Sequence, residues 1–357
     1  MTRRLLVFAP NWLGDAVMAL PAIADVRRAL PGATIDVAAR PSVAPLFSLV
    51  PDINEIRVLG SGHGAAKSLR DGRYEAALLL PNSFNAARIA WSAGIPERWG
   101  YRCDFRSPLL TAGVAAPTGV HQTEYYRQLV RELGFGVTGA AASAQAREGG
   151  HNGRPPRESK AAGLEVERTT LPQLEVSVQR REAARAWLVE DGWEPATPLV
   201  AVAPGAAFGS AKRWPAASFA ALIDALAADG IRGVVIGAAG DRLAATEVLA
   251  GVKAALPPLN LVGRTDVPAL AGVLVHCRSL ITNDSGAMHL AAALGVPVTA
   301  IFGPTRERET RPLGDRHRVL THPVWCRPCM LRECPLTHRC MTGVPVDGVL
   351  AATRAQL

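Results

Sequence analysis

Residues 279–294 read SLITNDSGAMHLAAAL, and this stretch decides the fold. The apolar run at 279–282 is typical of a buried strand, and the pattern from Ser285 to Leu294 is typical of a helix that ends at Gly295. Parallel strands need a crossover between them, and that crossover is usually a helix. The stretch therefore predicts an α/β protein built on a parallel sheet.

The same alternation continues on both sides of this stretch. In the second half of the chain we expect strands at 175–178, 199–203, 233–236, 259–262 and 298–302, and helices at 181–190, 216–228, 243–256 and 267–277. In the first half we expect strands at 5–9, 34–39, 55–59 and 75–80, and helices at 16–30, 43–50 and 86–93. Two such series in tandem predict two Rossmann-like, doubly wound domains that face a central cleft.

A stretch of different composition separates the two series. Residues 137–170 are rich in Ala, Gly, Ser, Arg and Pro, which is typical of a flexible linker or surface loop. We therefore predict an N-terminal domain over 1–172 and a C-terminal domain over 173–357.

The composition fits two globular domains and an anionic partner. Hydrophobic residues make up 48% of the 357 residues and charged residues 20%, and the net charge is +8. The sequence has no strip of arginines interleaved with aromatic residues, so we do not expect nucleic acid to be the partner. No stretch approaches 18 uninterrupted apolar residues, and Pro10 ends the first apolar run. We expect a cytoplasmic protein that rests on the inner membrane surface.

The polar residues inside 279–294 predict an anion site. Asp284 and Ser285 lie where a helix N-cap is expected, and Gly286 lets a ligand approach the backbone. Free N–H groups and the positive end of the helix dipole suit a diphosphate. His289 lies one turn further into the helix, on a face that can reach the same place. The alternative is ordinary capping by Asp284 and Ser285 beside a packed histidine.

A second junction of this kind, Asn11-Trp12-Leu13-Gly14-Asp15, follows the first predicted strand. Asp15 then projects into the cleft from the N-terminal domain, where a carboxylate can take a proton from an acceptor hydroxyl. The alternative is that Asp15 only caps the helix and Gly14 only serves the turn.

A third junction, Pro204-Gly205-Ala206, is followed by Lys212-Arg213-Trp214-Pro215. The strand at 199–203 brings this loop to the same edge of the second sheet. Lys212 and Arg213 can neutralise phosphate charge as a leaving group departs. The alternative is a solvated surface pair without a ligand.

Four of the six cysteines lie close together in the sequence, at Cys326, Cys329, Cys334 and Cys340. Four thiols can bind zinc tetrahedrally, and the spacing of the first pair is typical of structural zinc sites. An iron–sulfur cluster, a disulfide pair, or reduced thiols in a loop that touches the acceptor are the alternatives. We expect any metal here to be structural and not catalytic.

Taken together and in this order, the motifs resemble the ADP-heptose glycosyltransferases that assemble the lipopolysaccharide core of Gram-negative bacteria, glycosyltransferase family 9. The matching segments are 11–15, 204–206, 212–215, 283–286 with His289, and 302–305. The cysteine-bearing residues 326–335 are most similar to the branch that transfers the second heptose. The likeness covers nearly the whole chain apart from 137–170.

This resemblance implies a GT-B fold and an inverting transfer that needs no cofactor. The N-terminal half would bind the acceptor, heptosyl-Kdo2-lipid A, at the cytoplasmic face of the inner membrane. The C-terminal half would bind the donor, ADP-L-glycero-D-manno-heptose, and a last helix at 346–356 would cross back onto the first domain. The protein would act as a monomer. The alternatives are a heptosyltransferase for another core position and a non-catalytic homologue that only binds a nucleotide sugar.

The resemblance also implies roles for single residues. Asp15 would be the general base and Lys212 would stabilise the departing diphosphate. Asp284 would contact sugar hydroxyls or cap its helix. In the first-heptose branch a Glu follows the strand equivalent to 233–236, and Asp241 is the nearest acidic residue here, for ribose or heptose hydroxyls. The remaining expected contacts are Asn11, Trp12 and Gly14 for the acceptor, and Gly205, Arg213, Ser285, Gly286 and His289 for the donor.

Overall fold

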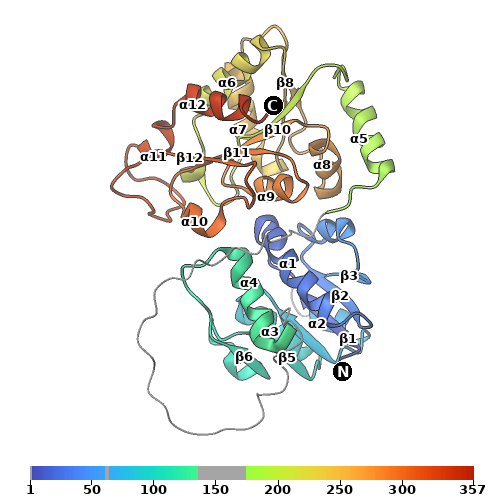
Figure 1. Cartoon of the computed structure of the whole chain (residues 1–357). Coiled ribbons are helices and arrows are strands. Elements are labelled where there is room, and N and C mark those ends of the chain that lie inside the picture. The colour runs from blue at the N-terminus through green and yellow to red at the C-terminus, as the bar shows by residue number, and fades with distance from the viewer. Residues whose placement is uncertain (1, 61–63, 136–173) are drawn as a thin grey trace.

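Two six-stranded parallel sheets organise the chain, which a computed structural model describes over residues 2–60, 64–135 and 174–357 (Figure 1). The strands of the first sheet are β1 (Arg4–Phe8), β2 (Thr34–Ala39), β3 (Glu55–Val58), β4 (Ala76–Leu79), β5 (Glu97–Tyr101) and β6 (Ala112–Val114). Its helices are α1 (Leu13–Ala29), α2 (Gly64–Arg70), α3 (Phe84–Ser92) and α4 (Gln122–Val130), with short helical turns at η1 (Ala44–Leu49), η2 (Ser107–Leu109) and η3 (Arg131–Phe135).

The second sheet is built in the same way. Its strands are β7 (Leu199–Ala203), β8 (Arg232–Val235), β9 (Leu259–Asn260), β10 (Ser279–Asn283), β11 (Val298–Phe302) and β12 (Arg318–Thr321). Its helices are α5 (Val178–Glu190), α6 (Ala216–Ala228), α7 (Arg242–Gly251), α8 (Val267–Leu274), α9 (Gly286–Ala293), α10 (Glu307–Thr310), α11 (Arg339–Thr342) and α12 (Val346–Arg354), with turns at η4 (Ser210–Lys212) and η5 (Ala239–Asp241).

Both sheets have the strand order of a Rossmann-like fold. The order is β3-β2-β1-β4-β5-β6 in the first sheet and β12-β11-β10-β7-β8-β9 in the second. The order reverses between β1 and β4 and between β7 and β10, and ligands of such folds bind at this switch point, beyond the carboxyl ends of the strands. The loops after β1, β7 and β10 carry the polar motifs of the sequence. The predicted pair of doubly wound domains is confirmed.

The two domains meet where α1 packs against α9 (Figure 1). The largest cluster of buried apolar residues includes both helices and continues into the core of each sheet. Contacts between α8 and η1 lie at the same interface. The motif after β1 and the motif after β10 are therefore held side by side.

Two predicted elements differ from the structure. Residues 175–178, expected as a strand, join no sheet, and α5 begins at Val178 with the Ser177 hydroxyl accepting the Arg180 N–H at 3.3 Å. A capped helix start competes here with the short apolar alternation that suggested a strand. Residues 43–50, expected as an α-helix, form the tighter turn η1 with Pro45 at its start.

The last helix was expected on the first domain, and this prediction is wrong. α12 packs against α6, β11 and β12 of the second domain, where Val349 and Leu350 are buried. Beyond it, the Gln356 amide donates to the Val298 carbonyl at 3.0 Å. The apolar face of α12 is thus covered within its own domain. The predicted boundary at 172/173 and the predicted loop at 137–170 lie outside the described residues.

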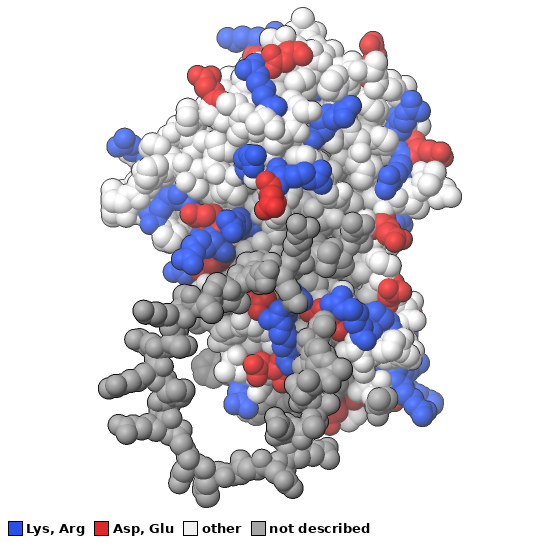
Figure 2. All heavy atoms as spheres, in the orientation of Figure 1, with Lys and Arg blue, Asp and Glu red and all other residues white. Residues whose placement is uncertain are grey.

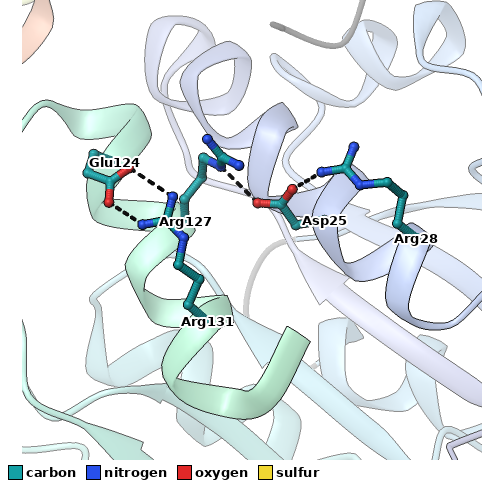
Figure 3. Close-up of polar contacts among 5 residues, drawn as sticks. All are labelled: Asp25, Arg28, Glu124, Arg127 and Arg131. Atoms are coloured by element: carbon teal, nitrogen blue, oxygen red, sulfur yellow. Dashed lines mark hydrogen bonds and ion pairs between the residues drawn. The ribbon is translucent and has the colours of Figure 1, made fainter. Parts of the chain in front are cut away.

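A buried carboxylate fixes α1 to α4 (Figure 3). Asp25 is 2% exposed, and its Oδ2 accepts a hydrogen bond from Arg127 Nε at 2.8 Å, while its Oδ1 pairs with Arg28. Glu124 on α4 and Arg131 at the start of η3 form a second, exposed pair. Because a buried charge needs a partner, the Asp25 cluster locks the orientation of α1.

Charges of both signs are mixed over the surface shown in Figure 2, without one field of a single sign. None of the described helices is long and apolar enough to span a membrane.

Candidate active site

The start of α9 presents unoccupied backbone N–H groups to the cleft. Ser285 is the N-cap residue, but its side chain makes no capping hydrogen bond and instead lies 2.9 Å from the Thr282 hydroxyl. Ser285 therefore does not cap α9 with its side chain, in contrast to the alternative considered from the sequence. Helix N–H groups without a side-chain cap bind anions well.

Asn283 connects this helix to the loop after β7. Its side-chain carbonyl accepts the Trp214 backbone N–H at 3.0 Å, and its amide donates to the Pro204 carbonyl at 2.8 Å. Asn283 is fully buried. These two hydrogen bonds set the position of the Lys212 loop. This role of Asn283 could not be predicted from the sequence, because an Asn at the end of a strand is common.

Lys212 and Asp284 form a buried ion pair at the cleft. Lys212 Nζ lies 2.5 Å from Asp284 Oδ2, and the Thr305 hydroxyl donates to the same oxygen at 2.8 Å. The side chains are only 13% and 7% exposed. An ammonium group has three donors, so Lys212 is oriented by Asp284 and keeps donors for a ligand oxygen.

Asp15 lies in the first turn of α1, near this pair. Burial raises the pKa of Asp15 to about 6; the Lys212 charge lowers it and the Asp284 charge raises it. Among the described residues, no hydrogen bond or ion pair to the Asp15 carboxylate is found. The N-cap of α1 is Trp12, so the alternative in which Asp15 only caps the helix does not hold. A half-buried carboxylate with a pKa near neutrality is suited to accept a proton.

Two glycines allow α1 and α9 to approach closely. A Cβ added to Gly14 would lie 2.8 Å from His289 Cδ2, and a Cβ added to Gly286 would lie 2.9 Å from Leu13 Cβ. The positive ends of two helix dipoles therefore converge here, with no side-chain cap on either helix. His289 is buried beneath this contact, and burial lowers its pKa to about 4, so the imidazole is neutral at pH 7.

A cavity of about 690 Å³ opens beside the glycine contact and has walls from both domains. Its size suits a nucleotide-sized ligand. Asp241 lies on one wall, packed against Gly205 and Gly237, and its Oδ2 accepts the Ala238 N–H at 2.9 Å. Of the residues expected from the sequence, this cavity is lined by Asn11, Trp12, Gly14, Gly205, Asp241, Ser285 and Gly286. The other expected residues do not line it: Asp15, Lys212, Arg213, Asp284 and His289.

A second cavity, of about 490 Å³, lies in the first domain at the carboxyl edge of its sheet. The two cavities adjoin each other, because both are lined by Asn11, Arg40 and Pro41. Arg88 and Arg40 place two guanidinium groups on the walls of the second cavity, which suits an anionic ligand. The two arginines could not be identified from the sequence, because they are separated in the chain and belong to no motif.

Residues 322–341, which contain the four clustered cysteines, form hydrogen bonds to the loops around the Lys212–Asp284 pair. The Arg332 carbonyl accepts the Ala211 N–H at 3.0 Å, and His338 Nε2 donates to the Ala211 carbonyl at 2.7 Å. On the other side, Arg327 Nε donates to the Gly303 carbonyl at 2.6 Å. Backbone, arginine and histidine groups therefore make these contacts, and the thiols do not.

The structural zinc at Cys326, Cys329, Cys334 and Cys340 stays a prediction. The six cysteines are present as free thiols in the structure. Within residues 2–60, 64–135 and 174–357, no group of three or more Cys, His, Asp or Glu side chains is placed to hold a metal ion. Cys326, Cys329, Cys334 and Cys340 line a cavity of about 300 Å³ together with His322 and Trp325.

Two Rossmann-like domains, with a cavity where they meet and a second cavity beside it in the first domain, have the architecture of the GT-B class. The family model described as glycosyltransferase family 9 (heptosyltransferase) matches residues 63–339. The chain belongs to this family.

Two similar proteins and one solved structure show which relatives the chain resembles over most of its length. Lipopolysaccharide heptosyltransferase 2 of Salmonella typhimurium is 32% identical over 89% of this chain and 87% of its own length. The protein of the same name from Escherichia coli is 31% identical over 89% of this chain and 87% of its own length. The solved structure of E. coli ADP-heptose lps heptosyltransferase II superposes with a TM-score of 0.78 at 29% identity, covering 99% of this chain and 98% of that one.

Proposed function

We propose that this enzyme transfers L-glycero-D-manno-heptose from ADP-L-glycero-D-manno-heptose to heptosyl-Kdo2-lipid A, adding the second heptose of the lipopolysaccharide inner core with inversion. The names of the similar proteins support this reaction. The observation that carries it is the placement of Asp15 and the Lys212–Asp284 pair at the contact of α1 with α9, directly beside Gly14 and Ser285 on the wall of a nucleotide-sized cavity.

The donor would bind in the larger cavity. Its diphosphate would lie against the free N–H groups at the start of α9, which Ser285 leaves uncapped. Asp241 would accept hydrogen bonds from ribose or heptose hydroxyls, and Val267 and Leu270 would contact the adenine. The neutral His289 would support the helix start from below.

The acceptor would bind in the cavity of the first domain. Arg40 and Arg88 would pair with its phosphate or carboxylate groups, and Asn11 lies on the wall shared with the donor cavity. This arrangement would direct an acceptor hydroxyl toward the donor from the Asp15 side of the cleft.

The chemistry follows from these positions. Asp15 takes the proton of the acceptor hydroxyl as its oxygen forms a bond to the anomeric carbon of the donor. The bond from that carbon to the diphosphate oxygen breaks on the opposite face, and ADP leaves with the electron pair. The sugar passes through a state resembling an oxocarbenium ion. Lys212 and the α9 N–H groups stabilise the charge that develops on ADP.

The proposed mechanism needs no cofactor because Asp15 supplies the base and Lys212 with α9 supplies the charge stabilisation. We further propose that the protein acts as a monomer on the cytoplasmic face of the inner membrane, where its acceptor is anchored. Arg213 is retained as a proposed donor contact, although it does not line the larger cavity.

The test is a transfer assay with ADP-heptose and two acceptors, heptosyl-Kdo2-lipid A and Kdo2-lipid A, in the same detergent. We expect a product only from the heptosylated acceptor, one heptose heavier by mass spectrometry. A product only from Kdo2-lipid A would place the enzyme at the first position and contradict the proposal. ADP binding without transfer to either acceptor would favour a non-catalytic homologue.

A further inference from the structure

Three large aromatic side chains are exposed on α3 and on the turn attached to its start, in the domain that holds the second cavity. Phe84 is 42% exposed, Trp91 57% and Phe105 93%. We call Phe84, Trp91 and Phe105 the aromatic rim. Exposed apolar residues that gather beside a binding cavity commonly mark an interaction surface.

Two members of the rim lie on one stripe of α3. Phe84 and Trp91 are seven residues apart, with Arg88 between them at position i+4, so all three project from the same side of the helix. The residues between them, 86–87 and 89–90, are buried against the domain. Arg88 also lines the basic cavity, which joins the rim to that cavity.

Phe105 is held outward by a fixed turn. Asp104 and Phe105 both have positive φ angles, of 50° and 55°, which non-glycine residues seldom adopt. Asp104 Oδ2 accepts the Phe84 backbone N–H at 2.6 Å, so the turn is attached to the start of α3. The next residue, Arg106, is fully buried and its Nε donates to the Tyr101 carbonyl at 2.9 Å. The turn and its contacts therefore hold Phe105 in an exposed position.

We propose that the aromatic rim docks on the surface of an anionic phospholipid bilayer. The inference rests on the proposed function, because an acceptor anchored in a bilayer has to reach the basic cavity. Phe and Trp side chains insert readily into the headgroup region. Arg88 lies between the rim and the cavity, and Arg70, whose guanidinium donates to the Ser92 carbonyl at 3.1 Å, lies at the far end of α3. Both arginines would attract anionic headgroups.

A competing surface lies on the second domain. Trp325 is 89% exposed there, with Leu336 at 57% nearby in the cysteine-bearing residues 322–341. That surface adjoins the cavity lined by cysteines and not the basic cavity. A bilayer bound there would not deliver a membrane-anchored sugar to Arg40 and Arg88. Variants of this second surface therefore serve as matched controls for variants of the aromatic rim.

The first experiment measures binding to sedimented vesicles of phosphatidylethanolamine and phosphatidylglycerol, with phosphatidylcholine vesicles for comparison. We expect the wild type to prefer the anionic vesicles. The double variant Trp91→Ser/Phe105→Ser should lower the partition constant at least about tenfold, because it removes two inserted aromatic side chains. The control Trp325→Ser/Leu336→Ser should bind as the wild type does. Loss of binding by the control but not by the rim variant would overturn the proposal, and so would a wild type that does not bind.

The second experiment separates docking from chemistry. With heptosyl-Kdo2-lipid A embedded in vesicles, the rim variant should show a raised KM. With a deacylated, water-soluble acceptor, its kcat/KM should equal that of the wild type. An equal loss on both acceptors would overturn the docking role. If the wild type binds vesicles through the rim but transfers no heptose to any acceptor, the proposed function fails and the docking surface stands.

Discussion

Helix α1 carries two aspartates whose surroundings are opposite. Asp25, near its end, is 2% exposed and is paired with Arg28 and Arg127. Asp15, in its first turn, has no such partner among the described residues, and burial raises its pKa to about 6. A paired carboxylate stabilises the fold, whereas a desolvated carboxylate without a partner is unfavourable for folding and is a feature of active sites.

Different contacts hold the two ends of α1 in place. The Asp25 cluster fixes the end of α1 to α4, and the Gly14–His289 contact fixes its start against α9. Asp15 is thus placed by a rigid element that is held at both ends. This rigidity is what a general base needs, because small displacements reduce the rate of proton transfer.

Replacing Asp15 should have the largest effect on activity. We expect Asp15→Asn to lower kcat by about 100-fold or more, because the acceptor hydroxyl then loses its base. The measurement is the transfer assay, with ADP binding by calorimetry as the control for the donor site. Asp25→Asn should keep most of its kcat per folded molecule. Comparable activity of Asp15→Asn and the wild type would contradict the catalytic role.

Replacing Asp25 should have the largest effect on stability. We expect Asp25→Ala to lower the free energy of unfolding by about 3–5 kcal/mol, because it leaves Arg127, whose side chain is only 14% exposed, without its partner. Urea unfolding at pH 7 measures this. The control is Glu124→Ala, which breaks the exposed pair with Arg131 and should cost less than about 1 kcal/mol. Equal losses in the free energy of unfolding would show that the Asp25 pair stabilises the fold no more than the exposed Glu124–Arg131 pair.

The pH dependence of stability gives a further test of the difference between Asp15 and Asp25. The native pKa of Asp15 is about 6 and its ordinary value is 3.8, so between these values the native state binds more protons than the unfolded state. Stability attributable to Asp15 is therefore present at acid pH and is lost as the pH rises toward 6. Asp15→Asn should be more stable than the wild type at pH 7.5 by at most about 3 kcal/mol. The difference should vanish near pH 3.5, and its persistence there would point to another cause.

The same pKa predicts the activity profile. The wild-type kcat/KM should fall as the pH drops through about 6, because a protonated Asp15 cannot act as a base. A profile that stays flat down to pH 4.5 would be incompatible with this residue as the base.

The smallest effect is expected at the helix contact. Gly14→Ala places a Cβ 2.8 Å from His289 Cδ2, so α1 and α9 must separate slightly. We expect a loss of stability of about 1–3 kcal/mol and a lower kcat/KM. Gly32→Ala is the matched control, because a Cβ there meets nothing within 4 Å. Thermal unfolding and the transfer assay compare the two variants.

Local pattern predicted most of the fold. The strand and helix in 279–294 and the junction at 11–15 follow from apolar periodicity and a polar residue at each turn, which are properties of neighbouring residues. Three strands at or near the sheet edges were missed. β5 and β12 mix charged, small and apolar residues, and β6 has only three residues. The Gln356 contacts that hold α12 on its own domain were not visible from sequence.

The sequence by itself thus determined the two doubly wound domains, the family and the residues at the loops of the cleft. The tertiary structure decided which of these residues meet. It brings Lys212 to Asp284 and assembles Arg40 and Arg88 into one cavity, and it assigns the cysteine-bearing residues to bracing contacts. The reason is physical: helix and strand patterns depend on near neighbours in the chain. The pKa of Asp15, an ion pair or a cavity depends on which distant segments exclude water together.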